Sequence, residues 1–163
     1  MYLQIFESLL TDLLSACRDH YGERLVSLVV FGSVARRSQR PDSDIDLMLV
    51  VDDLPDGRIP RVREFDLVEQ QLQTQLNQAA ADGVHTRLSP VLKSPEELEI
   101  GSPLLLDMVE EGRILFDRGN VFSKRLERLK RRLEELGARR IAKGGGYYWQ
   151  LKPDFKSGDV IEL

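Results

Sequence analysis

The stretch from residue 29 to residue 50, VVFGSVARRSQRPDSDIDLMLV, decides the fold of this chain. It opens with a β-branched and aromatic run that is typical of a strand and that stops at Gly32. Ser33 is a good residue to begin a helix, and the free N–H groups of such a turn suit a phosphate. After a short basic segment, the apolar run IDLMLV predicts a second strand. We therefore expect a strand, a glycine-serine turn and a second strand.

Two aspartates mark the beginning of the second strand. Successive side chains of a strand point to opposite faces, so Asp44 and Asp46 share one face while Ile45 and Leu47 share the other. The Cα atoms of the two aspartates would lie about 6.5 to 7 Å apart. From that spacing both carboxylates can bind one divalent ion, or a pair of ions about 3.5 to 4 Å apart. The motif therefore suits a metal site beside a phosphate site.

The composition is that of a soluble globular protein. The 163 residues are 42% hydrophobic and 31% charged, which suits one domain with a sizeable core, or one domain with an appended tail. The net charge of -4 argues against a surface that binds nucleic acid through overall basicity, although a local basic patch stays open.

The sequence argues against disulfides, structural zinc, a membrane span and a signal peptide. With Cys17 as the one cysteine and His20 and His85 as the two histidines, we expect neither an intrachain disulfide nor structural zinc. No apolar run approaches the length of about 18 residues that a membrane span needs. The N-terminus is acidic and amphipathic, unlike a signal peptide. The expected location is the cytoplasm.

Hydrophobic periodicity predicts the elements around the central motif. Apolar residues spaced by three and four predict an amphipathic helix over residues 3–17, ending near Gly22, and a long covering helix over residues 61–81. Strands are expected at residues 25–31, 45–52 and 84–92. The third of them contains Pro90, which has no N–H for a strand ladder and therefore favours the edge of the sheet.

The C-terminal third is predicted to return to the core through a series of short elements. Ser94 and Pro95 mark the start of a short capped helix, and residues 103–116 combine a helix, a glycine break and an apolar end. Residues 121–136 form a helix with a leucine stripe and basic residues on its other faces. Three uses of this helix stay open: docking on the body by the stripe, a dimer seam, and a surface for a polyanion.

A glycine run and an aromatic cluster characterise the end of the chain. Residues 144–146 are three glycines, which we interpret as a flexible hinge, and the tail YYWQLKPDFKSGDVIEL suits strand-like segments and a small hairpin. The cluster of Tyr147, Tyr148 and Trp149 either packs onto the body or a partner, or stacks on a base. We therefore divide the chain into a main domain, residues 1–118, and a C-terminal part, residues 119–163.

The central motif resembles the signature of the minimal nucleotidyltransferases of the DNA polymerase β-like superfamily. That signature is a G-S-x-A-R-G turn followed by S-D-I-D-L on the next strand. The matching residues are Gly32, Ser33, Ala35, Arg36, Ser43, Asp44, Ile45, Asp46 and Leu47. The resemblance implies an α/β (α+β) fold with a mixed β-sheet flanked by helices, extended here by a C-terminal helix and a small β tail.

The resemblance also implies roles for individual residues. Gly32, Ser33 and Arg36 would bind the phosphates of a nucleoside triphosphate, with ATP expected, while Asp44 and Asp46 would bind Mg²⁺ and act as the catalytic acids. The reaction would transfer a nucleoside monophosphate to an acceptor hydroxyl. A protein, a small molecule and an RNA end all stay open as the acceptor.

Two departures from the family pattern leave the activity open. Arg37 stands where the signature has its second glycine. Active members often carry a third carboxylate on a later strand, but the strand expected at residues 84–92 contains none, and Glu110 and Glu111 are the acids considered as its replacement. The alternatives are a nucleotide-binding module with weak or no catalysis, and an antitoxin-like partner of a small helical protein. A homodimer and a purely structural domain also stay open.

Overall fold

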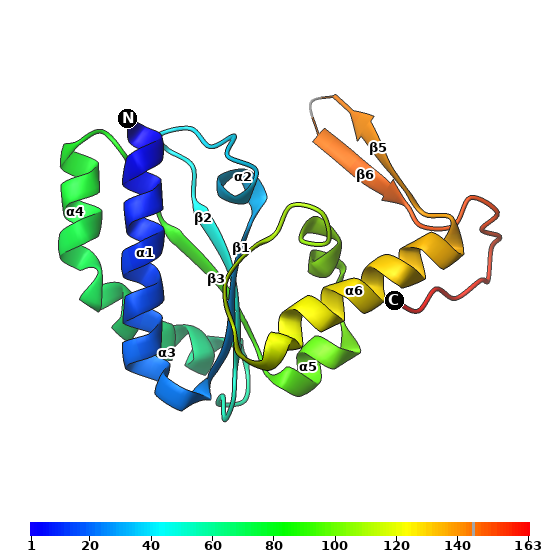
Figure 1. Ribbon diagram of the computed structural model, residues 1–163, viewed down its shortest axis with the longest axis horizontal. Coiled ribbons are helices and arrows are strands. Elements are labelled where there is room, and N and C mark those ends of the chain that lie inside the picture. Colours follow the sequence, from blue (N-terminus) through cyan, green and yellow to red (C-terminus); the bar gives the residue numbers. More distant parts are fainter. Residues whose placement is uncertain (145) are drawn as a thin grey trace.

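The centre of the molecule is a four-stranded mixed sheet with helices on both faces (Figure 1). The computed structural model describes residues 1–144 and 146–163. The strands of the sheet are β1 (Leu25–Phe31), β2 (Ile45–Val51), β3 (Leu88–Lys93) and β4 (Arg113–Asp117). They lie in the order β3-β2-β1-β4, where β1 is antiparallel to β2 and β4, and β2 is parallel to β3. This arrangement confirms the predicted fold class.

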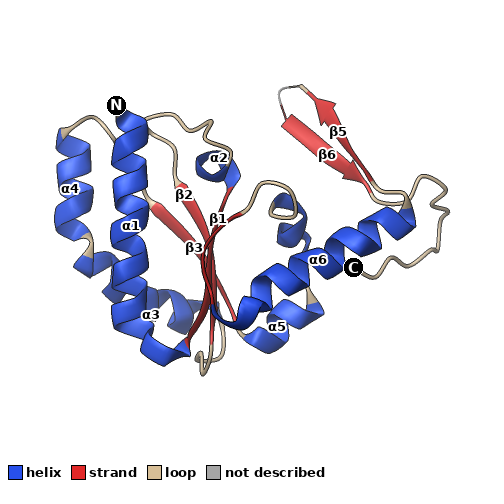
Figure 2. Cartoon of the chain, in the orientation of Figure 1, coloured by secondary structure: helices blue, strands red, loops and turns tan. Residues whose placement is uncertain are grey.

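Helices cover the sheet from two sides, as Figure 2 shows by colour. The α-helices are α1 (Tyr2–Tyr21), α2 (Gly32–Ala35), α3 (Arg58–Gln71), α4 (Gln73–Ala81), α5 (Pro95–Ile100) and α6 (Val121–Leu136). Short 3₁₀ helices are η1 (Gly22–Arg24), η2 (Pro103–Asp107) and η3 (Arg118–Asn120). α1, α3 and α4 lie on one face of the sheet, and α5 and α6 lie on the other (Figure 1). None of the helices in the described ranges combines the length and the apolar character that a membrane crossing requires.

The sheet is buried on both faces, because β1 sends alternate side chains into two separate cores. Leu28 and Val30 belong to a core that also contains Phe6 of α1. Val29 and Phe31 belong to a second core on the opposite face. Every residue of β1 is buried, which explains why the strand reads as a continuous apolar run.

The second core explains the leucine stripe of residues 121–136. Phe122, Leu129 and Leu133 of α6 are buried against the sheet residues of that core. Asp117 fixes the start of this helix, since its carboxylate accepts hydrogen bonds from the backbone N–H groups of Phe122 and Ser123, each at 2.9 Å. The predicted docking of the stripe on the body is therefore confirmed.

The long helix predicted over residues 61–81 is wrong in one respect. Leu72 has φ of -97° and ψ of 0°, and it separates α3 from α4. The apolar period continues across this break, because both helices pack on the same core. Periodicity alone therefore did not reveal the interruption.

The strand predictions are confirmed for β1 and β2 and need correction elsewhere. The strand expected at residues 84–92 begins only at Leu88, although Pro90 does lie on an edge strand, as predicted. The expected helix within residues 103–116 is reduced to the 3₁₀ helix η2, and the apolar end of this stretch is β4. Five residues are too few for a strand period to stand out from a helical one.

The hairpin at the end of the chain lies earlier than predicted. It consists of β5 (Arg139–Lys143) and β6 (Gly146–Gln150), which pair antiparallel. Gly144 thus follows the last residue of β5 and Gly146 is the first residue of β6, so these two glycines do not precede the hairpin as a hinge. Gly145 lies outside the described residues. The turns expected at 153–154 and 157–158 are present, but they join no further strands.

Candidate active site

The site begins where β1 ends and the single turn of α2 starts. Gly32 opens this turn with φ of +71°, a left-handed conformation that glycine adopts without strain. A Cβ atom at this position would lie 2.3 Å from Oδ2 of Asp46. Asp46 comes this close because it pairs with Phe31, the neighbour of Gly32, across β1 and β2. Glycine is therefore required both by the backbone and by the adjacent carboxylate.

Arg37 also has a left-handed backbone, with φ of +58°. Its N–H bonds to the carbonyl of Val34, and the next N–H, of Ser38, bonds to the carbonyl of Ser33. For a residue with a Cβ atom, such a conformation costs about 1 kcal/mol or more of conformational free energy. The second glycine of the family signature stands at this position, and its usual presence there has a physical reason.

The two aspartates of the motif differ in exposure. Asp44 is exposed just before β2, whereas Asp46 is partly buried within it. Burial, followed by the negative charge of Asp44 and a smaller contribution from Asp107, raises the pKa of Asp46, while Arg36 acts in the opposite direction. The pair therefore accumulates negative charge that a cation would neutralise.

An open cavity of about 700 Å³ lies over this turn and has the size of a typical small-ligand site. Its lining residues are Phe31, Gly32, Arg36, Asp46, Asp107, Arg140, Ala142, Gly146 and Tyr147. The cavity thus brings together three of the five predicted site residues: Gly32, Arg36 and Asp46. Ser33 and Asp44 are not among its lining residues; Ser33 lies in α2, and Asp44 directly precedes β2.

Sequence reasoning missed Asp107 and Arg140, and it considered Tyr147 only as part of an aromatic cluster that packs on the body or a partner or stacks on a base. Asp107 reaches the cavity from η2, and Arg140 and Tyr147 reach it from the hairpin. The hydroxyl of Tyr147 donates a hydrogen bond to Oδ1 of Asp107 at 3.0 Å, and the guanidinium of Arg140 lies 3.6 Å from the centre of the Tyr147 ring. The only sequence signal for Asp107 was a single acid at the end of the apolar run PLLL.

The third carboxylate is absent from β3, as the sequence indicated. Ser89 is the residue of β3 that stands opposite Asp46. Glu110 and Glu111 do not line the cavity; both form ion pairs with Arg140 at 2.8 Å, and Oε2 of Glu111 lies 3.7 Å from Nε of Arg36. They hold the hairpin and Arg36 in place, and Asp107 is the additional acid that faces the cavity.

A metal ion at this site would depend on few protein ligands. Within residues 1–144 and 146–163, no group of three or more His, Cys, Asp and Glu side chains is placed to hold a metal. Mg²⁺, however, is commonly bound through one or two carboxylates together with water and substrate phosphates. Asp44 and Asp46 supply hard oxygen ligands of this kind, so the residues present fit Mg²⁺ bound together with a nucleotide.

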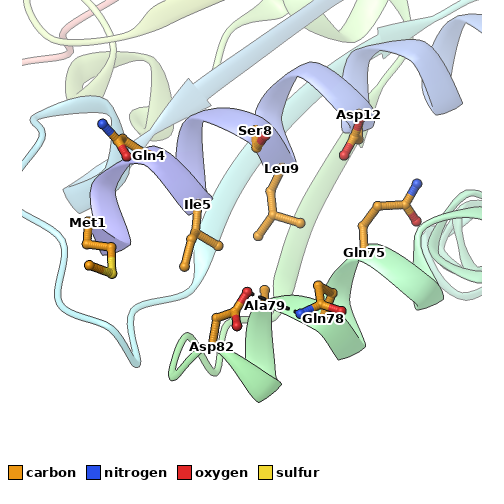
Figure 3. Close-up of a pocket in the computed structure, with 10 residues that line it drawn as sticks. All are labelled: Met1, Gln4, Ile5, Ser8, Leu9, Asp12, Gln75, Gln78, Ala79 and Asp82. Carbon is orange, nitrogen blue, oxygen red and sulfur yellow. Dashed lines mark hydrogen bonds between the residues drawn. The ribbon is translucent and has the colours of Figure 1, made fainter.

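A second pocket, of about 620 Å³, lies between α1 and α4 (Figure 3). Asp12 and Asp82 are the charged side chains that the figure labels, and Asp82 accepts a hydrogen bond from Gln78 at 3.2 Å. Two carboxylates and no Arg or Lys among its described lining residues make this pocket unsuitable for a polyphosphate. The cavity at Gly32 and Asp46 is the better nucleotide site.

Comparison with known proteins agrees with this geometry. The model of the nucleotidyltransferase domain family matches residues 10–116, which contain the turn and both aspartates of the motif. The chain belongs to the nucleotidyltransferase domain family. It is also 30% identical over 130 residues to a protein of Methanocaldococcus jannaschii named "Putative protein adenylyltransferase", with 78% of this chain and 82% of the relative covered.

Solved structures of toxin-antitoxin complexes resemble the chain more weakly. One, a toxin-antitoxin with AMP-PNP, has a TM-score of 0.46 and 17% identity and covers 78% of this chain and 91% of its own. A mutant of the toxin-antitoxin MntA-HpeT has a TM-score of 0.48 and 17% identity, covering 78% of this chain and 90% of its own. These scores add nothing to the family assignment.

Proposed function

We propose that this nucleotidyltransferase transfers AMP from ATP to an acceptor hydroxyl in the presence of Mg²⁺. The observation that carries the proposal is the closeness of Asp46 to the turn: Oδ2 of Asp46 lies 2.3 Å from the place that a Cβ atom on Gly32 would occupy. Only a residue without a side chain fits next to this carboxylate. A ligand phosphate can then contact the turn and a metal bound by the acid at the same time.

The residues of the proposed site divide into phosphate-binding and metal-binding groups. Gly32, Ser33 and Arg36 bind the phosphates, the first two through the backbone of the turn and Arg36 through its positive charge. Asp44 and Asp46 bind Mg²⁺, which would neutralise charge on the phosphates and on the leaving pyrophosphate. The site then has to hold the α-phosphate so that the acceptor oxygen and the leaving oxygen are roughly in line.

A hydroxyl group on a protein is the acceptor that we propose. The support is the name of the relative from Methanocaldococcus jannaschii, a protein adenylyltransferase by that name, and the extent of the similarity over both chains. The hairpin contributes Arg140, Ala142, Gly146 and Tyr147 to the lining of the cavity, so an acceptor side chain in the cavity would contact the hairpin or belong to it.

The test is transfer of label from ATP carrying a radioactive α-phosphate to proteins of a host-cell lysate. We expect labelled bands with the wild type and Mg²⁺, and at least a hundredfold less label with Asp44→Asn or Asp46→Asn. Asp42→Asn is the matched control, because Asp42 is an exposed acid of the same loop that pairs only with Arg40 among the described residues. Equal labelling by wild type and both site variants would contradict the proposal.

A nucleotide-binding module with weak or no catalysis is the second candidate function. It is favoured by Ser89, which stands opposite Asp46 where a third carboxylate would complete the acidic group. Such a module, acting as an antitoxin-like partner of a small helical protein or as a homodimer, would bind Mg²⁺ and ATP without transferring AMP to an acceptor. Calorimetric binding of ATP together with a complete lack of pyrophosphate release identifies this alternative.

A further inference from the structure

The hairpin presents two aromatic side chains to the body of the protein. Alternation along β6 places Tyr147 and Trp149 on one face and Tyr148 on the other. Trp149 packs against the second core, and Tyr147 lines the cavity that also contains Gly32 and Asp46. Tyr148 points away and is 49% exposed. Trp149 thus fixes the hairpin against the second core, and Tyr147 extends from the same strand face into the candidate site.

The ring of Tyr147 is held in place from two directions. Its hydroxyl donates to Asp107 Oδ1 at 3.0 Å, and Arg140 stacks on its ring at 3.6 Å. Arg140 is itself fixed by ion pairs of 2.8 Å to Glu110 and Glu111. The hydroxyl therefore has a defined position in the cavity and does not swing freely in solvent.

Tyr147 carries the one hydroxyl group among the described side chains that line this cavity. The other lining side chains are apolar, or are carboxylates and guanidinium groups, and none of these is an alcohol acceptor. Burial, and then the hydrogen bond to Asp107, raise the pKa of Tyr147, so the phenol keeps its proton at neutral pH. Transfer to this oxygen requires a base, and the Asp107 carboxylate lies within hydrogen-bonding distance of it.

We propose that Tyr147 is an acceptor of AMP in cis, with Asp107 as its general base. In this step the Tyr147 hydroxyl oxygen forms a bond to the α-phosphorus of ATP. The bond between that phosphorus and the oxygen bridging to the β-phosphate breaks, and pyrophosphate leaves with the electron pair. The phenol proton passes to the Asp107 carboxylate and from there to solvent. The product is a phosphodiester that joins adenosine to the oxygen of Tyr147.

The product also has a consequence for the site. An adenylylated Tyr147 can no longer donate its hydrogen to Asp107, and its new phosphate would lie beside Arg36 and Arg140 in the cavity. The modified hairpin would then occupy the position that the phosphates of the next ATP need. Self-modification is therefore expected to slow transfer to other acceptors.

This inference rests on the proposed function, and intact-protein mass spectrometry with peptide mapping tests it. After incubation with Mg²⁺ and ATP, we expect the wild-type chain to gain one AMP group at Tyr147, at a rate per molecule that does not depend on protein concentration. Tyr147→Phe should gain none. The matched control Tyr148→Phe should be modified like the wild type, because Tyr148 lies on the opposite face of the same strand.

Asp107→Asn tests the base separately. The amide oxygen still accepts the hydrogen bond from Tyr147 but takes up no proton, so modification should slow by about 10²- to 10⁴-fold while calorimetric binding of ATP with Mg²⁺ stays measurable. Label on lysate proteins without any on Tyr147 would overturn this inference and leave the proposed function standing. No binding of ATP and no AMP on any protein would overturn both.

Discussion

Gly32→Ala is the substitution that should disturb the candidate site while leaving the rest of the protein folded. Two costs follow from the structure. The left-handed backbone of Gly32, with φ of +71°, costs an alanine about 1 to 2 kcal/mol. In addition, the new Cβ would lie 2.3 Å from Oδ2 of Asp46, and Cβ contacts under 3.0 Å essentially never occur, so the carboxylate has to move by roughly 1 Å. A displacement of that size at a reacting centre costs about a hundredfold in rate.

Gly22→Ala is the matched control for this variant. Gly22 also has a left-handed φ, of +58°, but it lies at the opposite end of β1 and a Cβ there would meet nothing within 4 Å. Both variants should lose about 1 to 2 kcal/mol of unfolding free energy in urea denaturation. Only Gly32→Ala should slow the transfer of AMP from ATP with Mg²⁺, by about a hundredfold. Equal transfer rates for the two variants would refute the reasoning that Asp46 and the turn form one site.

Three further variants test charges and contacts in the site, at the start of α6 and in the hairpin. Burial and the charge of Asp44 raise the pKa of Asp46, so the ionisation of Asp46 opposes folding at neutral pH. Asp46→Asn should therefore raise the Tm at pH 7 in the absence of metal. This increase in Tm should vanish below the ordinary pKa of an aspartate, where Asp46 is protonated in both the folded and the unfolded state. Burial would raise the pKa of Asp117, but its hydrogen bonds from the start of α6 outweigh burial and hold that pKa below its usual range. Asp117→Ala should therefore cost about 1 to 2 kcal/mol in urea denaturation at pH 7 and progressively less as the pH falls through the folded-state pKa. Arg140→Ala should speed amide hydrogen exchange in β5 and β6 by about tenfold, through the loss of its ion pairs and ring contact, and leave exchange in β1 unchanged.

The part of the site that could be predicted from the sequence is the part built by local rules. The alternating pattern correctly predicted a strand that contains Asp46, with Asp44 directly before it, and the apolar run ending at Gly32 located the turn. Both patterns lie within one pair of adjacent strands. Their geometry follows from chain connectivity and strand pairing, and no distant contact is needed to fix it.

The part that could not be predicted depends on contacts between distant segments. Asp107, Arg140 and Tyr147 enter the cavity because α6 docks on the sheet and directs the hairpin back toward β1. β5, with the sequence RRIAK, is short and largely basic, so no apolar alternation marks it as a strand. The acid that faces the cavity therefore belongs to a segment whose position only the tertiary structure determines.

The most direct test of nucleotidyl transfer compares two radioactive forms of ATP. One carries its label in the α-phosphate and the other in the γ-phosphate; each is incubated with wild-type protein, Mg²⁺ and lysate. Transfer of AMP predicts that the α-label becomes bound to protein and the γ-label leaves as pyrophosphate. Protein that retains the γ-label, or that acquires neither label while Asp46→Asn behaves like the wild type, would contradict the assignment of this site to AMP transfer.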